Sequence, residues 1–158
     1  MLTYATPTNT VITLASLAQA SARESRVVDN TSTRYDDVLF NFWYQTTMGT
    51  IADDKVVYVY FYGGNNNGEF PANPAITGTD AAVVMAVNSS YNLSLGVVLN
   101  AINTQTTMRS EAISVGQALG GVLPPYWGFV VYNRTTLAFH PTEGNHGHSY
   151  AGVYYVGT

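Results

Sequence analysis

The sequence predicts an all-β protein: a single antiparallel β-sandwich with an extended N-terminal arm and at most one short helix. The first reason is composition, because the 158 residues include 19 Thr, 12 Tyr, 14 Gly and 13 Asn. Thr and Tyr favour pleated, half-buried strands, whereas Gly and Asn favour tight turns. The second is that about eight short segments with strand character follow one another at near-regular spacing, with almost no helical pattern between them.

The front of the chain predicts an arm. Residues 1–10 are rich in Thr, contain one Pro and carry no charged side chain. The apolar positions of residues 11–22 fit the period of a strand and that of a short helix equally well, so both remain open. We therefore expect an N-terminal arm over residues 1–22 and one sandwich domain over residues 23–158.

The clearest strand signals come from residues 38–45 and 56–62. Large apolar residues occupy every second position in both segments, which is typical of strands that bury one face. In the second segment, Tyr58, Tyr60 and Tyr62 share the opposite face. The link between the segments contains Gly and Asp, and so predicts that the two strands pair as a hairpin.

The remaining elements follow from turn residues and short apolar runs. Residues 63–80 are rich in Gly, Asn and Pro and predict a loop. One short helix is expected over Ser114–Leu119, ended by two glycines and then by two prolines. No internal repeat and no linker is evident. Further strands are expected at 81–87, 93–102, 127–132, around 136–140 and at 150–156.

Charge and cysteine content exclude several classes of function. Six basic residues against ten acidic ones give a net charge of −4, and only one of the six is Lys, so binding to nucleic-acid phosphates is not expected. The absence of Cys excludes disulfides and thiolate metal sites. No apolar run reaches the roughly 18 residues that span a bilayer, so no membrane association is predicted.

Three histidines form the main candidate for metal chemistry. His140, His146 and His148 lie within nine residues, with Glu143 among them, and such a set is compatible with zinc or another divalent metal. The segment around Glu143 has the composition of a turn, however, and loop histidines are more often solvated. We therefore predict no metal and no cofactor.

Paired carboxylates give no stronger sign of catalysis. Adjacent residues of a strand face opposite sides, so neither Asp36–Asp37 nor Asp53–Asp54 converges on one substrate. These pairs more simply mark strand ends and loop tips. No nucleophile elbow, phosphate-binding loop or zinc-protease motif is present. The chain is not predicted to be an enzyme, and a metal-assisted hydrolase at the histidines is the least favoured alternative.

The tyrosine row is the better candidate for recognition. An exposed row of Tyr58, Tyr60 and Tyr62 could stack on sugar rings or anchor a protein interface, because tyrosine offers a large contact area at low entropic cost. The low charge of the chain favours burial of this row against protein, either a neighbouring subunit or the terminal arm.

Three stretches of the sequence resemble a known group of proteins. They are Gly120–Val131 (GGVLPPYWGFVV), Thr77–Ala82 (TGTDAA) and Glu143–His146 (EGNH). With them, the region from about Leu17 to Val156 is similar to small virion proteins encoded by tailed bacteriophages. The resemblance implies a jelly-roll-like sandwich that serves as a head decoration (cement) protein, commonly trimeric over junctions between shell subunits. It carries over no catalytic residue.

The expected function is therefore that of a capsid decoration protein located in the virion, with the major capsid protein and further copies of itself, as a trimer, as its partners. The arm is expected to reach onto the shell and add a strand to a neighbouring sheet edge. The alternative is a carbohydrate-binding module of a tail or surface fibre, with Trp43 or Trp127 joining the tyrosines. The predicted interface residues are Leu2, Tyr4, Val11, Ile12, Leu14, Leu17, Tyr58, Tyr60 and Tyr62.

Overall fold

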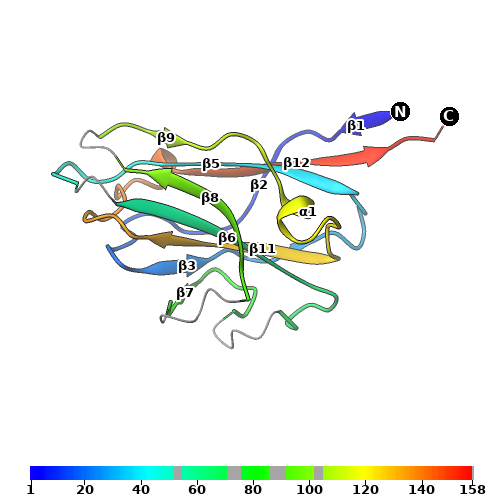
Figure 1. The fold of residues 1–158 in the computed structure, drawn as a ribbon, viewed down its shortest axis with the longest axis horizontal. Coiled ribbons are helices and arrows are strands. Elements are labelled where there is room, and N and C mark those ends of the chain that lie inside the picture. Colours follow the sequence, from blue (N-terminus) through cyan, green and yellow to red (C-terminus); the bar gives the residue numbers. More distant parts are fainter. Residues whose placement is uncertain (52–54, 71–75, 86–91, 102–104, 158) are drawn as a thin grey trace.

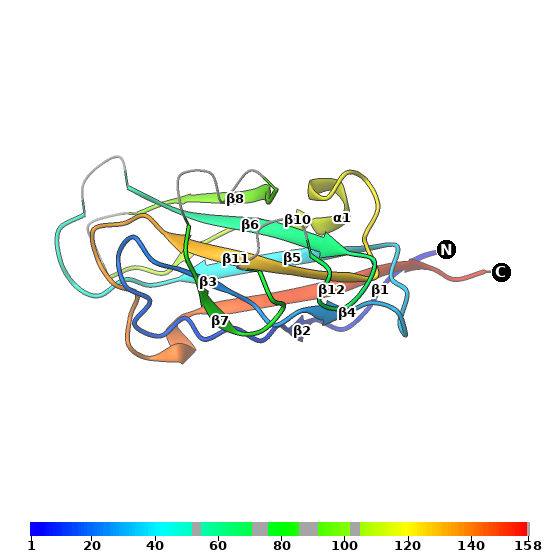
Figure 2. The ribbon, with the colours of Figure 1, turned by 90° about the horizontal axis from the view of Figure 1, so that it is seen from below.

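The computed structural model describes residues 1–51, 55–70, 76–85, 92–101 and 105–157, and these form two antiparallel sheets packed face to face (Figure 1, Figure 2). The predicted all-β sandwich is thus confirmed. Sheet A contains β1 (Leu2–Tyr4), β2 (Thr8–Asn9), β5 (Asp37–Tyr44), β9 (Met108–Arg109), β10 (Ile113–Ser114) and β12 (Gly147–Tyr155). Sheet B contains β3 (Ala22–Glu24), β4 (Val28–Asp29), β6 (Val56–Gly64), β7 (Ala81–Val83), β8 (Ser94–Asn100) and β11 (Tyr126–Asn133).

Each sheet is built around long central strands. In sheet A the order is β1–β12–β5–β10, with β2 beside β12 and β9 beside β5. In sheet B the order is β7–β3–β11–β6–β8, with β4 beside β11. The view of Figure 2 faces sheet B, with β5 and β12 of sheet A behind it. The core therefore lies between the β12–β5 pair and the β11–β6 pair.

The alternating pattern of the sequence places the core side chains as predicted. In β5 every second residue, from Val38 to Tyr44, is buried, and in β6 the inward residues Val57, Val59 and Phe61 are fully buried. Phe40 of sheet A meets Phe61 of sheet B edge to face, with ring centroids 5.3 Å apart. Such aromatic contacts contribute beyond the area that they bury.

The predicted hairpin between these two strands is wrong. β5 pairs with β12, β10 and β9, whereas β6 pairs with β11 and β8 in the other sheet. The connection over residues 45–55 is longer than the two to five residues typical of a hairpin loop. β5 and β6 each carry one large apolar face. Both faces are buried when the two strands lie opposite each other across the core, so the chain passes from one sheet to the other between them.

The predicted arm, residues 1–22, packs along the sandwich in this structure. Residues 2–9 are extended, as expected, but they pair along β12 of their own sheet. The chain then crosses to sheet B, and on the way Ile12 and Leu14 enter the core with 5% and 0% exposure. The alternation of these apolar residues with Thr13 turns both inward. Between β2 and β3 the segment forms neither the strand nor the helix considered above.

The other predicted elements are largely present. β7, β8, β11 and β12 lie where strands were expected, although the outer parts of the first two ranges, 86–87 and 102, lie outside the described residues. The exception is the strand around residues 136–140, where Phe139 makes only an isolated bridge with Thr46. The helix α1 (Val115–Ala118) begins after Ser114, whose hydroxyl accepts a hydrogen bond from the Gln117 amide. A 3-10 turn, η1 (Glu143–Asn145), precedes β12.

A second, smaller core covers the outer face of sheet B. Tyr62 and Val130 of the central strands are buried there by Ile76, Val83 and other residues that follow β6 in the sequence. The outer face of this sheet is therefore covered over part of its area by the chain itself, and not by the N-terminal segment.

Candidate binding surface at the terminal end of the sandwich

Both chain termini project together from one end of the molecule (Figure 1). The Met1 amino group donates to the Val156 carbonyl at 2.8 Å, and the Val156 amide donates back to the Met1 carbonyl at 3.0 Å. β1 is the edge strand of sheet A, and its outer side has no strand partner among the described residues. Unpaired amides and carbonyls of such an edge are able to bind a further strand.

One face of this projecting strand pair is apolar and exposed. Leu2 and Tyr4 of β1 point to the same side because they are two residues apart, and Tyr155 stands directly opposite Leu2 on β12. Their exposed fractions are 43%, 58% and 72%. We call Leu2, Tyr4 and Tyr155 the terminal patch. On the other face, Tyr154 packs against Tyr35, with ring centroids 6.0 Å apart.

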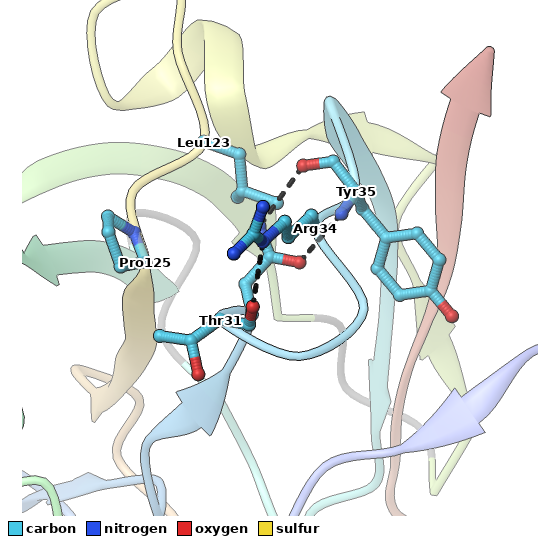
Figure 3. A pocket seen from close by; sticks show the side chains of 6 residues that line it. Thr31, Arg34, Tyr35, Leu123 and Pro125 are labelled. Carbon is cyan, nitrogen blue, oxygen red and sulfur yellow. Dashed lines mark hydrogen bonds between the residues drawn. The ribbon is translucent and has the colours of Figure 1, made fainter.

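An open pocket of about 390 Å³ lies between the loop that joins β4 to β5 and the segment before β11 (Figure 3). Backbone and side-chain hydrogen bonds hold this loop in shape. The Asn30 side chain accepts from the Tyr35 amide at 2.9 Å and donates to the Tyr35 carbonyl at 3.1 Å. The pocket is lined by Asn30, Thr31, Arg34, Tyr35, Leu123 and Pro125.

The loop that follows α1 forms the other wall of this pocket. Gly120 and Gly121 have φ values of +99° and +101°, a left-handed conformation that favours glycine. The turn exposes 75% of Val122. A second, smaller hollow of about 210 Å³ also lies against this loop. It is lined by Gly63, Gly64, Asn65, Leu119, Val122 and Pro124. The terminal end thus combines apolar surface with two hollows.

The predicted interface residues divide into two groups. Leu2, Tyr4 and Val11 are exposed, the last by 52%. Ile12 and Leu14 are buried in the chain's own core, and their contact with a partner stays a prediction. Their burial has a physical cause, since the segment closes one side of the sandwich. Leu17 is half-buried against the same core.

The tyrosine row does not form the continuous platform that the sequence suggested. Tyr62 is buried, and its hydroxyl donates to the Ser25 carbonyl at 2.9 Å. Tyr58 and Tyr60 are half-buried and stack on each other with ring centroids 5.8 Å apart. Trp127 is fully buried in the core, and Trp43 lies on sheet A beneath the Arg109 guanidinium. Neither tryptophan extends the row.

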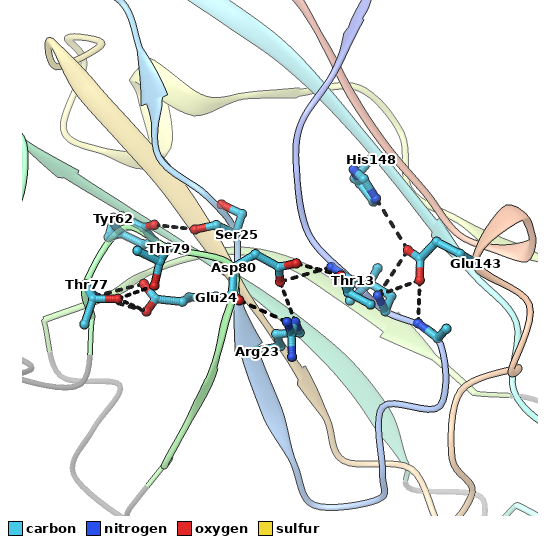
Figure 4. Close-up of polar contacts among 12 residues, drawn as sticks. Thr13, Arg23, Glu24, Ser25, Tyr62, Thr77, Thr79, Asp80, Glu143 and His148 are labelled. Carbon is cyan, nitrogen blue, oxygen red and sulfur yellow. Dashed lines mark hydrogen bonds and ion pairs between the residues drawn. The ribbon is translucent and has the colours of Figure 1, made fainter.

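Three carboxylates, those of Glu143, Asp80 and Glu24, each hold separate chain segments together and do not converge on one site (Figure 4). Glu143 accepts hydrogen bonds from the backbone amides of Leu14 and Ala15. Asp80 accepts from the Thr13 amide and hydroxyl and forms an ion pair with Arg23. These contacts fix the crossing segment of the N-terminal region against sheet B and the turn before β12.

The third of these carboxylates belongs to Glu24, which is fully buried on the outer side of sheet B. Its carboxylate accepts from the Thr77 hydroxyl at 2.7 Å, from the Thr77 amide at 3.0 Å and from the Gly78 amide at 2.9 Å. A buried carboxylate needs such donors to offset its lost hydration.

The remaining carboxylate pairs agree in part with the sequence interpretation. Asp37 begins β5 and accepts from the Gly116 amide at 2.7 Å and the Ser114 hydroxyl at 2.6 Å, so it anchors α1 to sheet A. Asp36 accepts from the Tyr155 amide at 3.2 Å. Both mark the start of a strand, as proposed. Asp53 and Asp54 lie outside the described residues.

The histidine side chains of the candidate metal site contact different partners. His146 Nε2 donates to the His140 carbonyl at 2.9 Å, and its ring stacks on Phe139. His148 Nδ1 lies 2.9 Å from the Thr10 hydroxyl, while its Nε2 is 4.0 Å from Glu143. Among the described residues, no three His, Cys, Asp or Glu side chains are placed to hold a metal ion.

Acidification is expected to weaken the fold through two of these histidines. Burial lowers the pKa of both His146 and His148 below the ordinary value of 6.5, although Glu143 raises both in part. His146 Nδ1 is buried without a hydrogen-bond partner, so its protonation places a charged N–H where no acceptor binds it. The unfolded chain then binds more protons than the folded one below pH 6.5, and stability falls as pH falls.

We expect the free energy of unfolding to decrease between pH 7.5 and 5.5, by at most about 1.4 kcal/mol per pH unit for each histidine. Urea denaturation at the two pH values measures this change. The double variant His146→Gln/His148→Gln should show a flatter pH dependence. An equally steep dependence in that variant would assign the effect to other groups.

Residues at the terminal end were only partly accessible to sequence reasoning. Leu2 and Tyr4 were predicted as contact residues, but Tyr155 was missed because its proximity depends on the pairing of the two chain ends. Arg34 was missed as well. The run of turn-forming residues between β4 and β5 was the only signal that could have drawn attention to it.

Two further findings bear on the class of this protein. No helix in the described residues is long and apolar enough to cross a membrane. No protein-family model, curated protein or solved structure matches the chain.

Proposed function

We propose that this chain is a structural protein of a phage virion, a head decoration protein that binds the shell through its terminal end. The observation that carries the proposal is the terminal patch on an unpaired edge strand. Exposed, contiguous apolar surface is typical of protein contact sites. The edge of β1 adds main-chain donors and acceptors, so a strand of the shell protein would gain both hydrogen bonds and apolar contacts. The resemblance to phage virion proteins supplies the partner.

The part of the chain that reaches the shell is shorter in this proposal than the whole N-terminal segment. Residues 11–22 close the sandwich, which leaves the β1–β12 end for binding. A short contact binds weakly by itself. In a closed trimer three such ends engage the shell together, and the effective concentration of the second and third contacts makes the trimer bind far more tightly than one copy.

Carbohydrate binding receives less support. A sugar platform needs several exposed aromatic rings on one face, and Tyr62 and Trp127 are buried. The stacked Tyr58 and Tyr60 are half-buried beside the second core. The three terminal-patch side chains are each more than 40% exposed, whereas Tyr58 and Tyr60 are half-buried.

The proposal is tested with purified particles of the phage that encodes the chain, stripped of this protein. We expect the wild-type protein to co-sediment with the particles, and the variant Tyr4→Ser/Tyr155→Ser to show at least about a tenfold lower bound fraction, because two apolar anchors are lost. Met48→Ser is the matched control, since Met48 is 81% exposed at a site away from the terminal end.

Near-ultraviolet circular dichroism establishes that each variant keeps its fold. Equal retention of the terminal-patch variant and the control would contradict binding through this end. Failure of the wild-type protein to bind any particle would contradict the decoration function itself.

A further inference from the structure

We propose that the pocket between the β4–β5 loop and the α1–β11 loop is a binding site for a carboxylate group, with the Arg34 guanidinium as its principal donor. This inference concerns a ligand site of the isolated chain and does not depend on the proposed function.

The Arg34 side chain is held at its Nε atom and, within the described part of the chain, free at both Nη atoms. Its Nε donates to the Thr31 carbonyl at 3.2 Å, which fixes the plane of the guanidinium. Neither Nη atom has a hydrogen-bond or ion-pair partner among the described residues. The Arg34 guanidinium lies between Thr31 and the wall that Leu123 and Pro125 form (Figure 3). The two free Nη groups form the end-on fork that matches both oxygens of a carboxylate.

A comparison with the other arginines sets this one apart. Arg23 pairs with Asp80, and Arg109 and Arg134 lie over the rings of Trp43 and Tyr132. Arg26 is exposed but lines neither hollow. Arg34 instead lines a pocket with its terminal nitrogens uncommitted. Its positive charge is therefore available to a ligand.

Arg34 also has an unusual backbone conformation. Its φ is +51°, in the left-handed region that glycine occupies without strain and that other residues rarely adopt. Strained residues of this kind concentrate at binding sites. The loop holds the conformation in place, since the Arg34 amide donates to the Asn30 carbonyl at 2.9 Å. The side chain is thus presented by a pre-organised loop, which lowers the cost of ordering it when a ligand binds.

The charges and apolar residues around the pocket favour a ligand with a single negative charge and an apolar body. One guanidinium faces the pocket, and the exposed Asp29 carboxylate lies close by, where it accepts from the Thr31 amide at 2.7 Å. Hydrogen bonds from Thr31 lower the pKa of Asp29, so this neighbour is charged and opposes a doubly charged phosphate. Leu123 and Pro125 offer apolar walls to the rest of the ligand. A monocarboxylate fits these conditions, either as a small organic acid or as an acidic side chain.

The test is a titration of the isolated protein with benzoate and with its neutral counterpart benzamide. Binding is measured by isothermal titration calorimetry and by the NMR resonance of the Arg34 side-chain Nε–H. We expect benzoate to bind at least about tenfold more tightly than benzamide, because only the anion forms the two charge-assisted hydrogen bonds. A second pair, N-acetylaspartate amide and N-acetylasparagine amide, distinguishes an acidic side chain from a free aromatic acid by which carboxylate binds more tightly.

Two variants keep the proposal falsifiable. Arg34→Gly removes the guanidinium and relieves the left-handed backbone, so we expect benzoate binding to be lost while the thermal midpoint is unchanged or higher. Arg26→Gln removes another exposed arginine that lines neither hollow and should leave binding unchanged. Equal affinity for benzoate and benzamide, or benzoate binding retained in Arg34→Gly, would overturn the proposal.

Discussion

Replacement of Phe40 by alanine is expected to lower the free energy of unfolding by about 3–5 kcal/mol, the range for a fully buried phenylalanine. Phe40 is fully buried in the middle of β5. Its ring contacts two rings of the opposite sheet, Phe61 at 5.3 Å and Phe129 at 4.8 Å between centroids. The change therefore removes apolar contacts and leaves a cavity at the point where the two sheets meet.

Urea denaturation of the wild-type protein, Phe40→Ala and Phe40→Leu measures this effect. Leucine refills much of the volume, so its cost should be well below that of alanine. Leu39, the half-buried neighbour on the other face of β5, provides a matched position. We expect Leu39→Ala to cost clearly less than Phe40→Ala. A similar loss in both alanine variants would mean that the core does not lie between β5 and β6 as described.

The strand pattern of this fold was readable because its cause is local. Alternating large apolar residues in β5 and β6 bury one face of each strand whatever the partner, so the two strands and their inward faces follow from the sequence. The choice of partner is not local. β5 pairs over most of its length with β12, more than 100 residues away, and no short-range signal specifies that pairing.

The N-terminal segment shows the same limit more sharply. Its small and apolar residues are compatible with an exposed arm. Two distant carboxylates hold the backbone of this segment. Asp80 accepts from the Thr13 amide, between Ile12 and Leu14, and Glu143 accepts from the amides of Leu14 and Ala15. A side chain that satisfies the backbone amides of a segment about 65 or 130 residues away leaves no pattern in a single sequence.

The candidate site depends on both kinds of information. Leu2 and Tyr4 could be selected from the sequence because they are large apolar residues in an uncharged segment. Tyr155 joins them only through the register of β1 on β12. Arg34 acquires its place through a left-handed backbone conformation at a non-glycine residue, which composition and periodicity do not reveal.

The buried carboxylate of Glu24 is the second position where a single change should have a large effect. Glu24→Ala is expected to lower the free energy of unfolding by about 2–4 kcal/mol, because hydrogen bonds to a charged group contribute about 1.5–3 kcal/mol and their loss leaves buried donors unsatisfied. The donors are the Thr77 amide and hydroxyl and the Gly78 amide, and all face the carboxylate. The polypeptide around them packs Ile76 over the outer face of sheet B.

The conservative variant separates charge and hydrogen bonding from the loss of side-chain volume. Glu24→Gln keeps the shape of the side chain, but its NH₂ group cannot accept the hydrogen bonds that the second carboxylate oxygen accepts. We therefore expect a substantial part of the alanine effect to remain. Glu111→Ala, at an exposed carboxylate with no hydrogen bond among the described residues, should change stability by no more than about 0.5 kcal/mol. Hydrogen exchange at the Thr77 and Gly78 amides should rise in both Glu24 variants. If Glu24→Gln matched the wild-type protein in stability and in exchange, the charged acceptor would not be what holds this turn, and the covering of sheet B would have to rest on its apolar contacts alone.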